Sequence, residues 1–70
     1  MAKVSWSDVE DLVKPLFEDG NAPERSDMID LAYAKDASDD VIDAIDSLHG
    51  KPIADLDTLK SLLTANGVLE

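Results

Sequence analysis

Five aspartates in a short part of the chain have the spacing of a binding surface. Residues 37–50 read ASDDVIDAIDSLHG, and side chains at i, i+4 and i+7 lie on one face of a helix. Asp39, Asp43 and Asp46 have this spacing. With two neighbours they form a group that we call the acidic strip: Asp36, Asp39, Asp40, Asp43 and Asp46. A row of carboxylates of this kind can bind cationic side chains of a partner protein.

The acidic strip carries a cost for the helix that holds it. Like charges at i, i+3 and i, i+4 destabilise a helix by roughly 0.2–0.5 kcal/mol per pair. Pairs among Asp39, Asp40, Asp43 and Asp46 therefore cost about 1 kcal/mol together. Solubility through net charge, a high-salt habitat or recognition of a basic protein surface accounts for such a strip. We expect these aspartates to be the partner-binding residues of a non-enzymatic protein-interaction module.

The tripeptide Asp46-Ser47-Leu48 offers a different chemistry. It resembles the Asp-Ser-Leu motif of acyl carrier proteins, which are also small, acidic and helical and bear phosphopantetheine on the serine. In those carriers the serine opens a long helix. Ser47 instead falls at the end of a predicted helix, and Gly50 and Pro52 prevent a long helix from starting there. A carrier function with Ser47 as the modified residue is therefore a disfavoured alternative.

The sequence predicts no metal site, no cofactor and no catalytic residue. An EF-hand calcium loop requires glycine at its sixth position, and the registers that begin at Asp19 and Asp36 both lack it. The chain has no cysteine and a single histidine, His49, so a zinc site of the usual kind is not expected. We expect His49 at the end of a helix, where its charge would complement the helix dipole. No serine, histidine and aspartate are spaced as a triad, so we expect no enzyme activity.

The charge balance restricts the class of partner. Sixteen acidic residues against six Lys and Arg give a net charge of −10, which repels phosphate, so neither nucleic acid nor an anionic membrane is expected to bind. An alternative is a DNA-mimic or phage-type inhibitor of a basic protein. Seven residues of the strip carry three charges over about 10.5 Å, where duplex DNA carries about six. Mimicry would therefore require Asp8, Asp11 and Glu18 on the same face.

Size and hydropathy set the remaining expectations. Seventy residues allow one small domain, here residues 1–70, with a single core and either a monomeric or a homodimeric state. No apolar run reaches the roughly 18 residues of a transmembrane helix, and the first residues do not resemble a signal peptide. We expect a cytoplasmic protein. Leu69 and Glu70 match residues that an expression vector often leaves.

The elements that must position these residues are helical. Apolar residues at helical spacing predict an all-α fold, a compact small bundle of three main helices plus one short helix. The predicted ranges are 5–18, 27–35, 39–49 and 56–65. Ser26, Ser38 and Asp55 are predicted N-caps of the second, third and fourth helices. Gly50 is predicted to end the third and Asn66-Gly67 the fourth.

Other features of the predicted helices are less regular. Pro15 lies inside the first helix and predicts a bend or an early end, and residues 20–23 read as a loop. Aromatic residues at apolar positions are predicted to belong to the core: Trp6, Phe17 and Tyr33.

From Pro23 to Leu63 the order of these signals resembles a family of small bacterial helical proteins classified as a domain of unknown function. The matching residues are Pro23, Ser26-Asp27, Ile29, Ala32, Ala37-Ser38-Asp39-Asp40-Val41, Ile45, Leu48, Ile53, Asp55, Leu56 and Leu59. The family often has an aromatic residue where this chain has Ile53, and the first helix has no counterpart. The resemblance implies a compact helical fold and assigns no activity and no functional residue.

Overall fold

The computed structural model describes residues 3–18, 20 and 22–70. Its helices are α1 (Trp6–Glu18), α2 (Arg25–Ala34), α3 (Asp39–Asp46) and α4 (Leu56–Ala65). The described residues contain no strand beyond an isolated parallel bridge between Val4 and Leu69, so the predicted all-α class is confirmed. Asp19 and Asn21, which belong to the rejected calcium register and the predicted loop, lie outside the described residues. No helix in the described part of the chain is long and apolar enough to cross a membrane.

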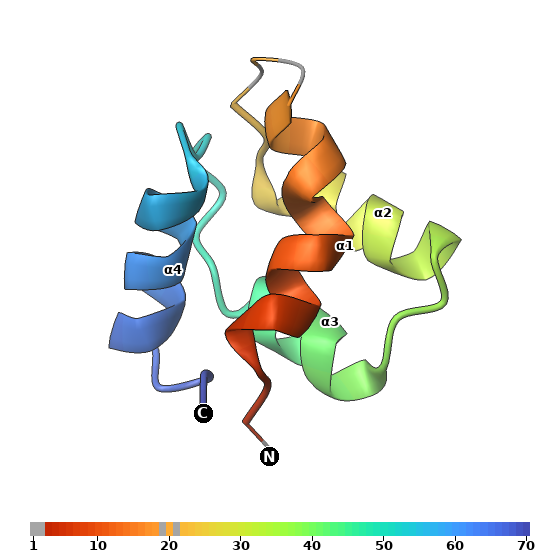
Figure 1. The fold of residues 1–70 in the computed structure, drawn as a ribbon, viewed down its shortest axis with the longest axis vertical. Coiled ribbons are helices and arrows are strands. Elements are labelled where there is room, and N and C mark those ends of the chain that lie inside the picture. The colour runs from red at the N-terminus through yellow and green to blue at the C-terminus, as the bar shows by residue number, and fades with distance from the viewer. Residues whose placement is uncertain (1–2, 19, 21) are drawn as a thin grey trace.

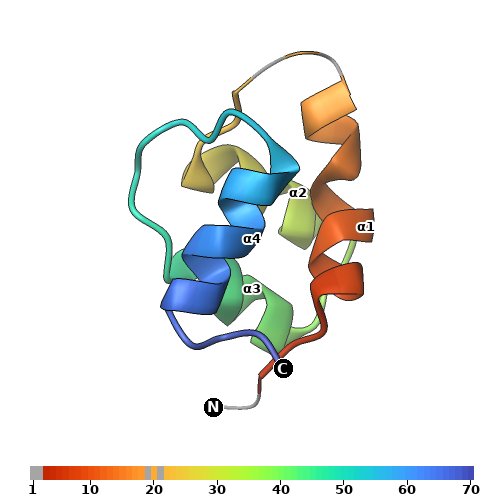
Figure 2. The same cartoon turned by 60° about the vertical axis from the view of Figure 1, so that its left-hand side comes forward.

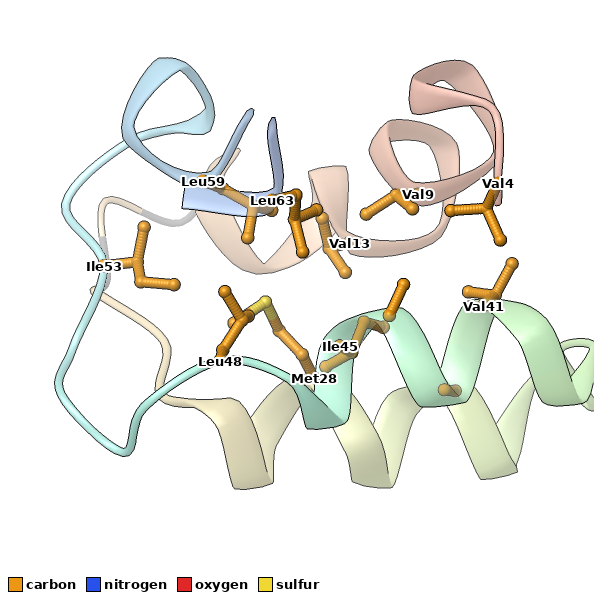
Figure 3. Packing of buried hydrophobic residues seen from close by; sticks show 12 residues of the cluster. Val4, Val9, Val13, Met28, Val41, Ile45, Leu48, Ile53, Leu59 and Leu63 are labelled. Carbon is orange, nitrogen blue, oxygen red and sulfur yellow. The ribbon is translucent and has the colours of Figure 1, made fainter. Parts of the chain in front are cut away.

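The four helices form two layers around one core. Helix α1 packs against α2 and α4, and α2 packs against α3 (Figure 1). Seen from the side of the core, α1 and α4 lie over α2 and α3 (Figure 3). The segment at Val4 and the C-terminal residues run side by side below the helices (Figure 2), where the Val4 amide donates to the Val68 carbonyl and the Glu70 amide to the Val4 carbonyl, both at 2.9 Å. These bonds join the two ends of the described chain.

The core contains only apolar side chains. Its buried members are Val4, Val9, Val13, Met28, Ala32, Val41, Ala44, Ile45, Leu48, Ile53, Leu59 and Leu63. No polar or charged residue in the described part of the chain is buried. Figure 3 shows Val13 and Leu63 of the upper layer above Met28 and Ile45 of the lower layer. Each helix contributes two or three of these side chains, so the fold depends on all four helices packing together.

One predicted core residue is wrong. Tyr33 is 67% exposed, although Trp6 and Phe17 do pack against the core. Helix α2 buries Met28 and Ala32, which lie one turn apart. Since successive residues turn by about 100°, Tyr33 points about 120° away from the centre of that face.

The starts of α3 and α4 agree with the predicted caps. The Ser38 Oγ accepts a bond from the Val41 amide at 3.4 Å, and the Asp55 Oδ1 accepts one from the Thr58 amide at 2.7 Å. The predicted start of α2 is wrong. Glu24, not Ser26, is its N-cap, and the Asp27 carboxylate accepts a bond from the Glu24 amide at 3.1 Å. A carboxylate three residues into a helix satisfies the cap amide in this way.

The predicted end of α3 is also wrong. The helix ends at Asp46 rather than at His49, and Gly50 does not adopt the left-handed conformation of a C-terminal cap. The Ser47 hydroxyl donates to the Ala44 carbonyl at 2.6 Å, and the Leu48 amide bonds to Ile45 only three residues back. Such short-range bonds tighten and end a helix.

The last turns of α1 and α4 also bear on the sequence predictions. Helix α1 continues past Pro15 to Glu18, which confirms the predicted end at residue 18; of the two expectations for Pro15, a bend or an early end, the early end is wrong. Pro15 is exposed, while Leu16 and Phe17 pack against the core and hold the last turn in place. Helix α4 ends as predicted, with Gly67 in the left-handed region at φ 73°.

The cap of α4 makes a prediction about pH. The Asp55 carboxylate accepts hydrogen bonds from Thr58, from its side chain first and its backbone amide second, and these lower the pKa of Asp55 from its ordinary value of 3.8. A lowered folded-state pKa contributes stability above the unfolded-state pKa, and this is lost as pH falls through the folded-state pKa. We expect Asp55→Asn to melt below wild type at pH 7, with the gap closing below about pH 4. Thermal melts followed by circular dichroism measure this difference in melting temperature.

The matched control is Asp57→Asn, which removes a charge from the same helical turn and leaves the cap bond in place. Its gap to wild type should change less with pH than that of Asp55→Asn. A constant gap for Asp55→Asn down to about pH 2.5, well below the ordinary Asp value, would contradict the assigned role of the charged cap.

Candidate functional site

The acidic strip lies on the outer side of α3 and the turn before it. All five of its aspartates are exposed. The same helix buries Val41, Ala44 and Ile45, and Val41 and Ile45 point from it towards α1 and α4 (Figure 3). Because Asp39 and Asp43 are on the opposite side of the helical wheel, burial of the apolar face fixes the strip towards solvent.

One strip residue has a cationic partner within the fold. The Arg25 guanidinium lies 2.9 Å from the Asp46 carboxylate and also donates to the Asp46 carbonyl at 3.3 Å. This pair joins the start of α2 to the end of α3. Its side chains are 43% and 66% exposed, so the pair contributes about 0–1 kcal/mol. Among the described residues no ion pair involves the other four strip aspartates.

Asp36 has an unusual backbone conformation. Its φ is 56°, in the left-handed region where residues other than glycine are uncommon. It follows α2 in a turn in which its own amide bonds to the Tyr33 carbonyl at 3.2 Å and the Ala37 amide bonds to the Ala32 carbonyl at 2.9 Å. This is the bonding pattern of a helix end that usually carries glycine. A carboxylate is thus present at a position where a glycine would suit the backbone better.

Ser47 links the ends of two helices. Its hydroxyl accepts a bond from the Asn66 Nδ2 at 3.1 Å while donating to Ala44, and Asn66 also donates to the Ser47 carbonyl at 3.3 Å. The position after the last turn of α3 agrees with the sequence prediction. The hydroxyl therefore has a local role in joining α3 to α4, which is independent of any prosthetic group.

His49 does not have the position that the sequence predicts. It is exposed, lies three residues beyond the end of α3, and its Nδ1 accepts a bond from the Lys51 amide at 3.3 Å. It helps to form the turn that leads to Pro52. Within residues 3–18, 20 and 22–70, no three His, Cys, Asp or Glu side chains are grouped to hold a metal ion.

Two hollows flank the acidic strip, and the sequence did not predict either. The smaller, of about 130 Å³, lies between Asp40 and Asp43 of α3 and the C-terminal turn, with Lys3 at its edge. The larger, of about 290 Å³, lies between α1 and the turn from α2 to α3. Asp8 and Asp11, which the sequence proposed as possible neighbours of the strip, line the larger hollow, whereas Glu18 does not. A hollow between distant segments has no signal in a single sequence.

Comparison with known proteins gives no assignment. No known protein family, curated protein or solved structure matches the chain. The candidate site is therefore argued from its own residues.

The charge of the strip predicts a salt effect. If repulsion among these carboxylates limits stability, the melting temperature should rise between about 10 mM and about 0.5 M NaCl, as the Debye length falls from about 30 Å to about 4 Å. A variant with Asp39, Asp40 and Asp43 changed to Asn should show a smaller rise in the same calorimetric scans. An equal rise in both proteins would place the repulsion outside the strip.

The conformation of Asp36 predicts a stabilising substitution. Asp36→Gly should raise the free energy of unfolding by about 0.5–1 kcal/mol, because glycine adopts a positive φ without steric cost. Asp36→Ala removes the same charge and keeps the Cβ atom, so it should be no more stable than wild type. Urea denaturation measures the free energy of unfolding of both variants. A glycine variant less stable than the alanine variant would show that the backbone conformation costs nothing.

Proposed function

We propose that this protein is a non-enzymatic protein-interaction module whose acidic strip binds a basic surface of a partner protein, without a cofactor. The observation that carries the proposal is that Asp36, Asp39, Asp40 and Asp43 form no ion pair in the described part of the chain, although Lys3 lies at the edge of the hollow that Asp40 and Asp43 line. Their charges are exposed and available to an external cation.

Two local costs support recognition over solubility alone. Like-charge pairs within α3 cost about 1 kcal/mol, and Asp36 occupies a left-handed position that favours glycine. Net charge for solubility could be placed anywhere on the surface, without either cost. Aspartates at these positions are better accounted for by a contact that requires them there.

A second candidate is an inhibitor that mimics DNA and occupies the basic site of a nucleic-acid-binding protein. It is favoured by Asp8 and Asp11, which line a hollow together with Ser38 and Val41 at the start of α3. Glu18, the third acid that mimicry would require, is at the opposite end of α1. Asp8 and Asp11 thus raise the density of negative charge only near the start of α3, at one end of the strip.

The proposal is tested by capture from extracts of the source cell. Immobilised wild-type protein is compared with a strip variant in which Asp39, Asp40 and Asp43 are changed to Asn. Asp46 is left unchanged because it binds Arg25, and Asp36 because its backbone conformation matters. We expect a basic protein to be recovered on wild type and reduced roughly tenfold on the strip variant, since each exposed charge pair contributes up to about 1 kcal/mol.

The matched control changes the same net charge on three other helices, with Glu18→Gln, Asp30→Asn and Asp57→Asn. It should recover the partner as well as wild type does. Equal losses on both variants would show that net charge alone attracts the captured proteins and would contradict the proposal. If duplex DNA competes with this protein for the purified partner, the DNA-mimic candidate replaces the general one.

A further inference from the structure

The larger hollow beside the acidic strip combines an apolar floor with a charged edge. We call it the α1–α3 hollow, and its lining residues are Asp8, Asp11, Leu12, Lys35, Ala37, Ser38 and Val41. Val41 is buried and Leu12 and Ala37 are half-buried, whereas Asp8, Asp11 and Lys35 are exposed. The apolar side chains thus lie beneath a border that carries two carboxylates and one ammonium group.

We propose that the α1–α3 hollow receives an apolar side chain from a basic amphipathic helix of the partner, while Asp8 and Asp11 bind its Lys or Arg side chains. This inference rests on the proposed function and names the chemistry of the partner. A volume of about 290 Å³ is at the lower limit of small-molecule pockets, which span about 300–1,000 Å³. It suits one or two side chains of a protein rather than a whole ligand.

Charge selects a basic partner over a second copy of this chain. Two copies would each bring a net charge of −10, and a copy docked here would place further carboxylates against Asp8 and Asp11. Asp8 also lies in the first turn of α1, where the helix dipole accounts for an acid. Asp11 lies beyond the reach of that effect, and no ion pair involves it among the described residues.

The hollow adjoins the start of α3, although no residue of the acidic strip lines it. Ser38 lines the hollow and also caps α3, which carries the strip aspartates Asp39 and Asp43. An amphipathic helix can place apolar residues and flanking cations on adjacent faces, as groove-binding helices do. A segment seated in the hollow would therefore bring its cations to both Asp11 and the start of the strip.

Substitution of Lys35 tests the proposal in the opposite direction, because it should tighten binding rather than weaken it. Lys35 is the one cation among the residues that line the hollow, so it repels a basic segment that docks there. Lys35→Glu should tighten binding roughly threefold, and Asp8→Asn with Asp11→Asn should weaken it by a similar factor. Glu18→Gln with Asp30→Asn makes the same charge change as the latter pair away from the hollow, and should have little effect.

The probe is a synthetic peptide of leucine and lysine at helical spacing, titrated into isotopically labelled protein and followed by amide chemical shifts. A second peptide has serine in place of leucine and the same charge. We expect the leucine peptide to bind roughly tenfold more tightly. Its shifts should centre on Asp11, Leu12 and Ala37. Thermal melts of each variant verify that it is folded.

The outcomes separate this inference from the proposed function. Chemical-shift changes confined to Asp39 and Asp43, with no change in affinity for Lys35→Glu, would overturn the proposal of binding at the hollow. They would leave the strip as the binding surface. Equal affinities for the two peptides, or no binding of either, would also overturn that proposal. Shifts at the hollow that depend on protein concentration without peptide would assign it to a second copy instead. The proposed function fails separately, if capture shows no partner that depends on the strip.

Discussion

Burial of one apolar face on each of four short helices is the constraint on which the remaining structure depends. The chain has no disulfide, and the described core contains no polar group. A core of this size supplies only about 3–5 kcal/mol, and helices of 8 to 13 residues are marginal in isolation. The position of every surface residue therefore depends on which side chains each helix buries. In α3, burial of Val41 and Ile45 leaves the aspartates no direction other than solvent.

Bonds between distant segments then hold the layers in register. Lys60 of α4 lies with its ammonium group 6.0 Å from the centre of the Trp6 ring of α1, and the Ile53 amide donates to the Pro23 carbonyl at 3.0 Å. The Arg25–Asp46 pair joins α2 to α3 in the same manner. Each of these contacts is individually weak. Each contact nevertheless connects the end or edge of one element to another element.

The sequence predicted what local chemistry determines. Ser38 and Asp55 cap their helices because a short side chain with an oxygen can reach an amide three residues ahead, although the same rule placed the cap of α2 at Ser26 instead of Glu24. The apolar period also identified the buried faces. The other errors arose where packing or a contact from another element decided between local options. Packing of Leu16 and Phe17 outweighed Pro15, the bonds of Ser47 ended α3 before His49, and the narrow buried face of α2 left Tyr33 exposed. The strip, like the caps, was predictable because it depends on spacing within one helix. The α1–α3 hollow was not, because it depends on the approach of α1 to a turn far along the chain.

The many aspartates of the chain do not all require a functional explanation, and separating them sharpens the candidate site. Asp27 and Asp55 satisfy helix-cap amides, and Asp46 binds Arg25. Asp8, Asp39 and Asp57 lie in first helical turns, where the dipole favours an anion. Asp43 has none of these reasons, because it lies in the second turn of α3 with Asp39 and Asp46 as neighbours of like charge. Asp11 lies beyond the first turn of α1 as well, but Lys14, three residues further on, gives it an opposite charge on the same helix. Asp43 is therefore a carboxylate that helix chemistry does not explain. It lies at the centre of the strip on α3, which is why the proposed contact with a basic partner is centred on it.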